Sequence, residues 1–305
     1  MTAKMIPVVT VTDATLDSSS ITENDFPVYN PATTYAASTE AAPVKVIYLH
    51  VIWESVQGSN TGNTPSVDNV AFWTKLLATN KWSVFDGYVQ NQSTRAESAQ
   101  WVVTPGAIVS SVSLFNMNAA SVTITVTEPT AGVVYNRTIS LVDNSGVFDA
   151  YSYFFSPVVT KKNFCVTDLP PYANAAISVT VNNPGGTAAI GQITFGHPEI
   201  FGETLNLMPL GLKDYTLLNE DGFGRTFPTV RGYSRKTSPA ISVDSYRVTY
   251  LEGRIAELRG VPTVWAFDTV NGDNELVYLG FFTDMNFLYS HSEKTILDLE
   301  IRSLV

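Results

Sequence analysis

Side chains that commonly do chemistry are few in this chain, and their spacing matches no familiar reactive site. The three histidines, His50, His197 and His291, lie far apart and share no metal-ligand spacing. The sequence contains no HExxH, GxSxG or P-loop motif. Cys165, the only cysteine, lies between a phenylalanine and a valine and is predicted to be buried, and alone it can form no intramolecular disulfide. We therefore predict a protein that is not an enzyme and has no catalytic residue, cofactor or metal.

Two acidic groups resemble reactive sites in composition only. The stretch 268–274 has the residue types of a cation site, but its spacing is not that of an EF-hand, and a hairpin turn at Asn271-Gly272 accounts for it. The stretch 214–221 could supply the carboxylate pair of a glycan hydrolase, but turns favour Asp as well. A hydrolase is therefore the least favoured function. The residues are Asp268, Asn271, Asp273 and Asn274 in the first group, and Asp214, Glu220 and Asp221 in the second.

The composition favours a β-rich protein that buries surface in an assembly. Of the 305 residues, 45% are hydrophobic and only 15% are charged, against about a quarter in an average soluble domain. The net charge of −10 argues against nucleic acid as a partner. No apolar run approaches the roughly 20 residues that cross a bilayer, so we expect no membrane insertion.

Alternating apolar and polar residues predict β-strands along most of the chain. In the stretch 121–127, Val122, Ile124 and Val126 alternate with threonines, and 177–182 repeats the pattern. The stretch 45–53 predicts one long strand. Short helices fit only at 66–78 and 248–258. We expect a mainly β protein whose central part is an antiparallel, jelly-roll-like β-sandwich.

Composition shifts divide the chain into four predicted parts. Residues 1–25 form an N-terminal arm, 26–80 a small module, 81–200 the β-sandwich and 201–305 a β-rich assembly domain. The stretch 191–235 is dense in Gly and aromatic residues and follows neither a strand nor a helix period. We interpret it as a structured connector, neither strand nor helix, between two β-rich halves.

Basic residues concentrate in the last part of this acidic chain. Charge complementarity between subunits would place them at assembly contacts. The alternative is that they are scattered, solvated side chains, which are common on protein surfaces. The predicted assembly contacts are Arg225, Arg231, Arg235 and Arg247.

The stretch 26–80 is similar to the small chitin-binding type of carbohydrate-binding module found in phage tail proteins. The similarity rests on Asn30-Pro31 before Tyr35, on 53–55 (WES) and 60–65 (NTGNTP), and on Trp73. The chain departs from the pattern at 36–38, where such modules usually have a Val-Gly-Asp turn. The resemblance implies that Tyr35, Trp53 and Trp73 stack on sugar rings. The alternative is that the tryptophans are the core of a domain too small to have another.

Short blocks along nearly the whole chain resemble, in their order, a family of tailed-bacteriophage tail proteins. The chain departs from that family at 208–210 and 217–218, where relatives tend to be more polar and richer in glycine. The blocks are 82–86 (WSVFD), 91–94 (NQST), 153–155 (YFF), 168–172 (DLPPY), 201–204 (FGET), 211–215 (GLKDY), 221–224 (DGFG) and 299–301 (LEI).

The resemblance implies a structural virion protein at the tail tip, the baseplate or an appendage attachment. Such a protein forms a homo-oligomer and contacts other phage tail proteins. We expect it in the virion, after synthesis in the host cytoplasm, because the N-terminal stretch lacks the apolar core of a signal peptide. The alternative is a receptor-binding protein that recognises a host cell-surface glycan.

Overall fold

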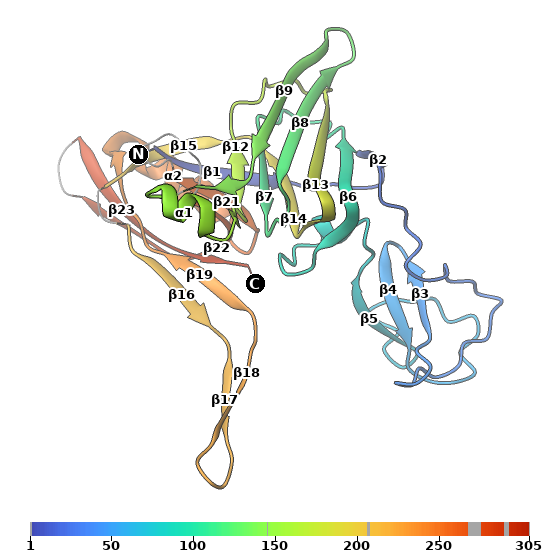
Figure 1. Ribbon diagram of the computed structural model, residues 1–305. Helices are drawn as coiled ribbons and strands as arrows, with labels where there is room; N and C mark the ends of the chain where they lie inside the picture. The colour runs from blue at the N-terminus through green and yellow to red at the C-terminus, as the bar shows by residue number, and fades with distance from the viewer. Residues whose placement is uncertain (1, 145, 206–207, 268–275, 290–292, 305) are drawn as a thin grey trace.

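The computed structural model describes residues 2–144, 146–205, 208–267, 276–289 and 293–304, and it confirms a mainly β protein. Figure 1 shows a barrel, a two-sheet unit beside it, a small N-terminal module, and a hairpin that projects away from the barrel. No helix among the described residues is long and apolar enough to cross a bilayer. The predicted hairpin turn at Asn271-Gly272 lies outside the described residues.

Six strands close into an antiparallel barrel, which therefore has no free edge within the ring. Phe201, Trp265 and Leu297 are fully buried in its core. Helix α2 (Val248–Glu257) adds Leu251 and Ile255 to the same core, because its apolar residues recur at helical spacing. In ring order the strands are β1 (Thr2–Val9), β15 (Glu199–Thr204), β20 (Ala240–Asp244), β23 (Lys294–Ser303), β22 (Leu276–Tyr289) and β21 (Thr263–Phe267).

The two-sheet unit buries one core between two antiparallel sheets. The predicted alternation in β8 is confirmed, because Val122, Ile124 and Val126 are buried in that core while the threonines between them are not. Trp101 lies fully buried in the same core. One sheet has the order β2 (Leu16–Ser19), β6 (Ser93–Val103), β13 (Ala176–Ile190), β8 (Ser121–Glu128) and β9 (Gly132–Ser140); the other has β12 (Phe164–Val166), β7 (Ser111–Phe115) and β14 (Gln192–Gly196).

Strand β1 belongs to both the barrel and the two-sheet unit. Its first part pairs with β15 and β21, and its last residues, Val8 and Val9, pair with Gly196 and Phe195 of β14. A Cβ atom at Gly196 would lie 2.5 Å from the carbonyl oxygen of Pro7, so only glycine permits this approach. The segment 2–25, expected as a separate N-terminal arm, thus supplies β1 and β2 to the two larger units.

The N-terminal module is a three-stranded sheet of β3 (Lys45–Tyr48), β4 (Val51–Ser55) and β5 (Trp73–Ala78). The prediction of a single strand over 45–53 was wrong. Leu49 and His50 adopt positive φ angles of 48° and 63° and turn the chain back on itself between β3 and β4. A run of apolar residues does not reveal such a turn when neither turn residue is Gly or Asn.

The projecting hairpin spans residues 210–237, and from here on "the arm" means this hairpin and not residues 1–25. At its base β16 (Leu210–Asp214) pairs with β19 (Tyr233–Thr237), which also pairs with barrel strand β23. Beyond the base, β17 (Leu217–Glu220) pairs with β18 (Thr226–Thr229). The prediction that this stretch holds no ordinary strands was therefore wrong. Every residue of β17 and β18 is exposed. Because neither strand has a buried face, their sequences need not alternate apolar and polar residues.

The remaining elements are short and lie between the main strands. The helix considered for 66–78 is absent from that described stretch, which contains turns followed by β5. Helix α1 carries no buried residue, although Asp149 caps its first turn. These elements are η1 (Ser83–Phe85), β10 (Val142–Asp143), α1 (Ala150–Phe155), β11 (Val159–Thr160) and η2 (Ser245–Arg247).

Candidate functional site

The structure brings the three predicted sugar-stacking residues together, but as parts of one small core. Trp53 and Trp73 are 5% and 1% exposed. Their indole N–H groups donate to the backbone carbonyls of Tyr48 and Asn63, at 3.2 and 2.7 Å. Neither indole therefore presents a free face to solvent.

Tyr35 is the half-buried member of the three. Its ring lies 5.2 Å from that of Trp73 in an edge-on arrangement and 5.8 Å from that of Tyr29 in a stacked one. Its hydroxyl accepts a hydrogen bond from the backbone N–H of Asn30 at 2.8 Å. Tyr35 thus covers the module core on one side and leaves only part of its surface for contact with another molecule.

The NTGNTP loop at 60–65 has a structural explanation. Asn60 is fully buried, and its side-chain NH₂ donates to the hydroxyl of Ser55 and to the carbonyl of Phe72. Its backbone exchanges hydrogen bonds with Tyr35 at 2.9 and 3.2 Å. The side-chain amide of Asn60 therefore joins the loop to the module core.

The arm carries large apolar side chains that nothing covers in the single chain. Leu218, Phe223 and Val230 are 70%, 89% and 82% exposed. Its tip is held by Asp221, whose Oδ1 accepts from the backbone N–H groups of Phe223 and Arg225, both at 2.8 Å. The tip is thus an ordered turn with an apolar surface.

Two acidic residues of the arm, Asp214 and Asp221, form turns. Asp214 accepts hydrogen bonds from both the backbone N–H and the hydroxyl of Thr216, and these bonds hold the pKa of its carboxyl below the ordinary value. A carboxylate with a lowered pKa stays ionised and cannot serve as a general acid near neutral pH. Turn hydrogen bonds thus account for Asp214 and Asp221, two of the three residues of the acidic cluster.

The predicted assembly arginines fall into two groups. Arg225 and Arg231 are exposed on the arm, and Arg235 lies at its base with the guanidinium 4.9 Å from the centre of the Tyr278 ring. Arg235 also lines a cleft between the barrel and the two-sheet unit. Arg247 lies apart from the arm, before α2, and donates to the carbonyl of Ile200 at 3.1 Å. Three of the four arginines thus lie on the arm, a hairpin that the sequence analysis had not predicted.

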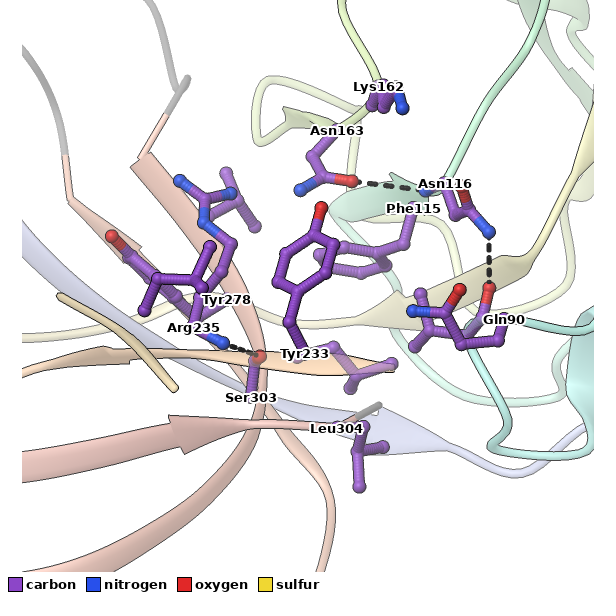
Figure 2. A pocket seen from close by; sticks show the side chains of 14 residues that line it. Gln90, Phe115, Asn116, Lys162, Asn163, Tyr233, Arg235, Tyr278, Ser303 and Leu304 are labelled. Atoms are coloured by element: carbon purple, nitrogen blue, oxygen red, sulfur yellow. Dashed lines mark hydrogen bonds between the residues drawn. The ribbon is translucent and has the colours of Figure 1, made fainter. Parts of the chain in front are cut away.

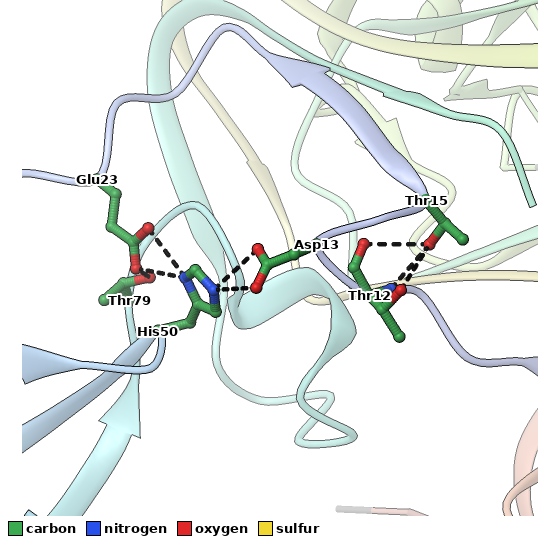
Figure 3. A network of polar contacts seen from close by, with 6 residues as sticks. All are labelled: Thr12, Asp13, Thr15, Glu23, His50 and Thr79. Carbon is green, nitrogen blue, oxygen red and sulfur yellow. Dashed lines mark hydrogen bonds and ion pairs between the residues drawn. The ribbon is translucent and has the colours of Figure 1, made fainter.

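His50 links the N-terminal module to the rest of the chain (Figure 3). Its Nδ1 lies 3.0 Å from Glu23 and its Nε2 lies 2.9 Å from Asp13, while its ring lies 4.3 Å from that of Trp82. Burial acts to lower the pKa of His50, but the hydrogen bonds and charges of Asp13 and Glu23 outweigh burial and raise the pKa above its ordinary value of 6.5. The imidazolium form fits this site because both ring nitrogens face carboxylates.

The other candidates for chemistry are isolated. His197 Nδ1 lies 2.7 Å from the hydroxyl of Ser110, and His291 lies outside the described residues. Cys165 is buried, as predicted, and its sulfur accepts from the hydroxyl of Ser113. Within the described ranges, no group of three or more His, Cys, Asp or Glu residues is arranged to hold a metal ion.

A second exposed apolar surface was not singled out as a contact surface from the sequence. Five aromatic residues lie within residues 148–155, and each is at least 70% exposed. The sequence feature that could have revealed this surface is a local run of aromatic residues with a single charged residue among them, Asp149. The residues are Phe148, Tyr151, Tyr153, Phe154 and Phe155.

Comparison with known proteins identifies no relative: no family model, no curated protein and no solved structure matches the chain.

Proposed function

We propose that this chain is a noncatalytic structural subunit of a phage tail, located in the virion at the tail tip, the baseplate or an appendage attachment. It assembles as a homo-oligomer and contacts other tail proteins. In this proposal the two-sheet unit is a jelly-roll-like sandwich, and residues 26–80 are a chitin-binding-like module retained mainly as a folded spacer. The resemblance of the ordered sequence blocks supports the family, and the low charge supports an assembly subunit.

The arm is the observation that carries the assembly proposal. An isolated two-stranded hairpin is only marginally stable in water, and every residue of β17 and β18 is exposed in the described structure, including Leu218 and Phe227. Exposed apolar surface of this kind is typical of a protein–protein contact. A neighbouring subunit that covered Leu218 and Phe223 would stabilise the arm and gain contact area.

The arm also offers charge complementarity. Arg225 and Arg231 are exposed on it, while the whole chain has a net charge of −10. A positive arm that approaches an acidic neighbour is steered toward it by electrostatic attraction. Assembly through the arm should therefore weaken as salt concentration rises.

The proposal is tested by measuring the mass of the purified full chain in solution. We expect oligomers for the native chain and a shift toward monomer, by about tenfold or more in dissociation constant, for the double variant Leu218→Ser and Phe223→Ser, because two buried apolar side chains would be lost. Val67→Ser is the matched control, since Val67 is an exposed apolar residue of the module, remote from the arm in sequence. A monomeric native chain, or an oligomer insensitive to both arm substitutions, would contradict assembly through the arm.

Location in the virion needs a separate measurement. An antibody against residues 26–80, viewed by electron microscopy on intact virions of the phage that encodes the chain, should label the tail. Absence of label from every virion, together with binding of the purified protein to bacterial envelopes, would favour the alternative of a free receptor-binding protein. The cleft lined by Arg235, Lys162 and Asn163, which offers several hydrogen-bond donors, favours glycan recognition as a second function.

A further inference from the structure

The cleft lies where the barrel, the two-sheet unit and the base of the arm meet (Figure 2). Its volume is about 330 Å³, within the range of about 300–1,000 Å³ typical of small-molecule sites. Phe115 from β7 and Val277 and Leu279 from β22 supply apolar lining. Junctions between structural units are common places for ligand sites, because neither unit fills the space alone.

Hydrogen-bond donors surround this apolar lining. Arg235 comes from β19, where its backbone N–H donates to the hydroxyl of Ser303 at 2.8 Å. Its guanidinium lies over the face of Tyr278, which fixes the direction of the charge. Lys162 and Asn163 line the opposite side, from the two-sheet unit. Figure 2 shows Tyr233 in the middle of the cleft, with its hydroxyl directed toward the side chain of Asn163.

The amide of Asn163 has a defined orientation. Its Oδ1 accepts from the backbone N–H of Asn116 at 3.1 Å, and Asn116 is held in turn by its own side-chain bond to the carbonyl of Val89 at 2.8 Å. With the oxygen engaged, the NH₂ group of Asn163 is the part of the amide that can donate to a ligand. A fixed carboxamide beside a tyrosine ring is a suitable partner for a sugar hydroxyl.

No acidic side chain balances the two cations. The residues that line the cleft include Arg235 and Lys162 but, among the described residues, neither Asp nor Glu. Within the described part of the chain, neither cation forms an ion pair with a carboxylate. In a chain with a net charge of −10, a cleft whose described lining has two cations and neither Asp nor Glu favours an anionic ligand.

We propose that this cleft binds a carboxylate-bearing saccharide unit, such as a uronic acid residue. The carboxylate pairs with the Arg235 guanidinium, with Lys162 adding positive potential. The sugar ring lies against Tyr233, and a ring hydroxyl accepts a hydrogen bond from Asn163. The cleft uses Tyr233 and Arg235 at the base of the arm, whereas the assembly proposal rests on Leu218 and Phe223 of its outer part, which do not line the cleft. The site also differs from the buried aromatic cluster of the N-terminal module.

The test compares two probes that differ only in the carboxylate. Methyl β-glucuronide and methyl β-glucoside are titrated into the full-length protein and observed by saturation-transfer NMR. We expect millimolar binding of the glucuronide and about tenfold weaker binding of the glucoside, because one charge-assisted hydrogen-bond pair separates them. Acetate in equal concentration should displace neither probe efficiently, because it lacks the ring that contacts Tyr233.

Two variants and a control locate the site. Arg235→Gln should weaken glucuronide binding about tenfold, because it removes the paired cation. Asn163→Asp keeps the oxygen that accepts from Asn116 but places a negative charge in the cleft, so it should abolish binding. Arg231→Gln, an exposed arginine of the arm that does not line the cleft, should leave binding unchanged.

Several results would overturn the proposal. They are equal binding of the two probes, no binding of either, full displacement by acetate, or unchanged binding by both cleft variants when they are folded. The mass of each variant in solution is measured in parallel. An oligomer that does not bind the glucuronide would contradict only the cleft, and a monomer that binds it would contradict only assembly through the arm.

Discussion

The contact between His50 and its two carboxylates should make attachment of the N-terminal module depend on pH. Both ring nitrogens lie within 3.0 Å of a carboxylate oxygen. A neutral imidazole has one N–H, so it can donate to Asp13 or to Glu23 but not to both. Deprotonation therefore leaves one nitrogen lone pair facing a carboxylate oxygen.

The direction in which stability changes with pH follows from the direction of the pKa shift of His50. Because the pKa of folded His50 is raised above 6.5, the stabilising contribution is fully present below pH 6.5 and is lost as pH rises through the folded pKa. The contact with Glu23, whose side chain is 20% exposed, is a hydrogen bond between charged groups that contributes about 1.5–3 kcal/mol. The contact with Asp13, whose side chain is 72% exposed, contributes about 0–1 kcal/mol. After discounting for solvent, we expect a total of about 2 kcal/mol.

The assay is equilibrium unfolding by urea from pH 6 to pH 9, for the native chain and for His50→Gln. The difference in unfolding free energy between the two chains isolates His50, because the other titrating groups are common to both. We expect a difference of about 2 kcal/mol at pH 6 that shrinks at alkaline pH. His197→Gln is the matched control, since the described contact of the His197 ring is with the hydroxyl of Ser110 rather than with a carboxylate. A difference that stays constant with pH, or grows as pH rises, would refute the reasoning.

Three further predictions test packing. Trp73→Ala should destabilise the N-terminal module by about 3–5 kcal/mol in urea unfolding, because Trp73 is 1% exposed in a small core; an effect below about 1 kcal/mol would contradict its role. Gly280→Ala should lose at least about 1–3 kcal/mol in thermal unfolding, since the new Cβ would lie 2.0 Å from the Arg302 carbonyl oxygen, whereas Gly253→Ala on α2, with open space around it, should be neutral or stabilising. Cys165 should resist a thiol reagent until the protein unfolds, and rapid labelling of the native chain would show that it is accessible.

Local alternation was sufficient to predict two strands of the two-sheet unit, β8 at 121–127 and the first part of β13 at 177–182. Val122, Ile124 and Val126 are adjacent in the period-2 pattern, and one sheet face buries all three. The short helix considered for 248–258 is present as α2, where Leu251 and Ile255 are buried at helical spacing. Burial of Cys165 followed from its apolar neighbours. Each of these features depends on residues that are close in sequence and belong to one strand or helix, so the local sequence pattern is enough to predict it.

The candidate sites were predicted less well. Tyr35, Trp53 and Trp73 were correctly grouped in space, but residue type alone does not separate an exposed sugar platform from a core. The cleft joins Arg235, Asn163 and Tyr278 from strands and loops far apart in the chain, and no local spacing relates them. The arm escaped prediction because its outer strands, β17 and β18, have no buried face.

The sequence by itself determined that this protein is built of β-strands, since alternation of apolar and polar residues needs only the two faces of a single strand. It also determined that no histidine or cysteine motif is present. Only the tertiary structure decided that β1 closes a barrel with β15 and β21, which lie far from it along the chain. It also decided that the ring of His50 lies between the carboxylates of Asp13 and Glu23. Such pairings depend on long-range hydrogen bonds and packing between elements, and a pattern within one element carries no record of its partner.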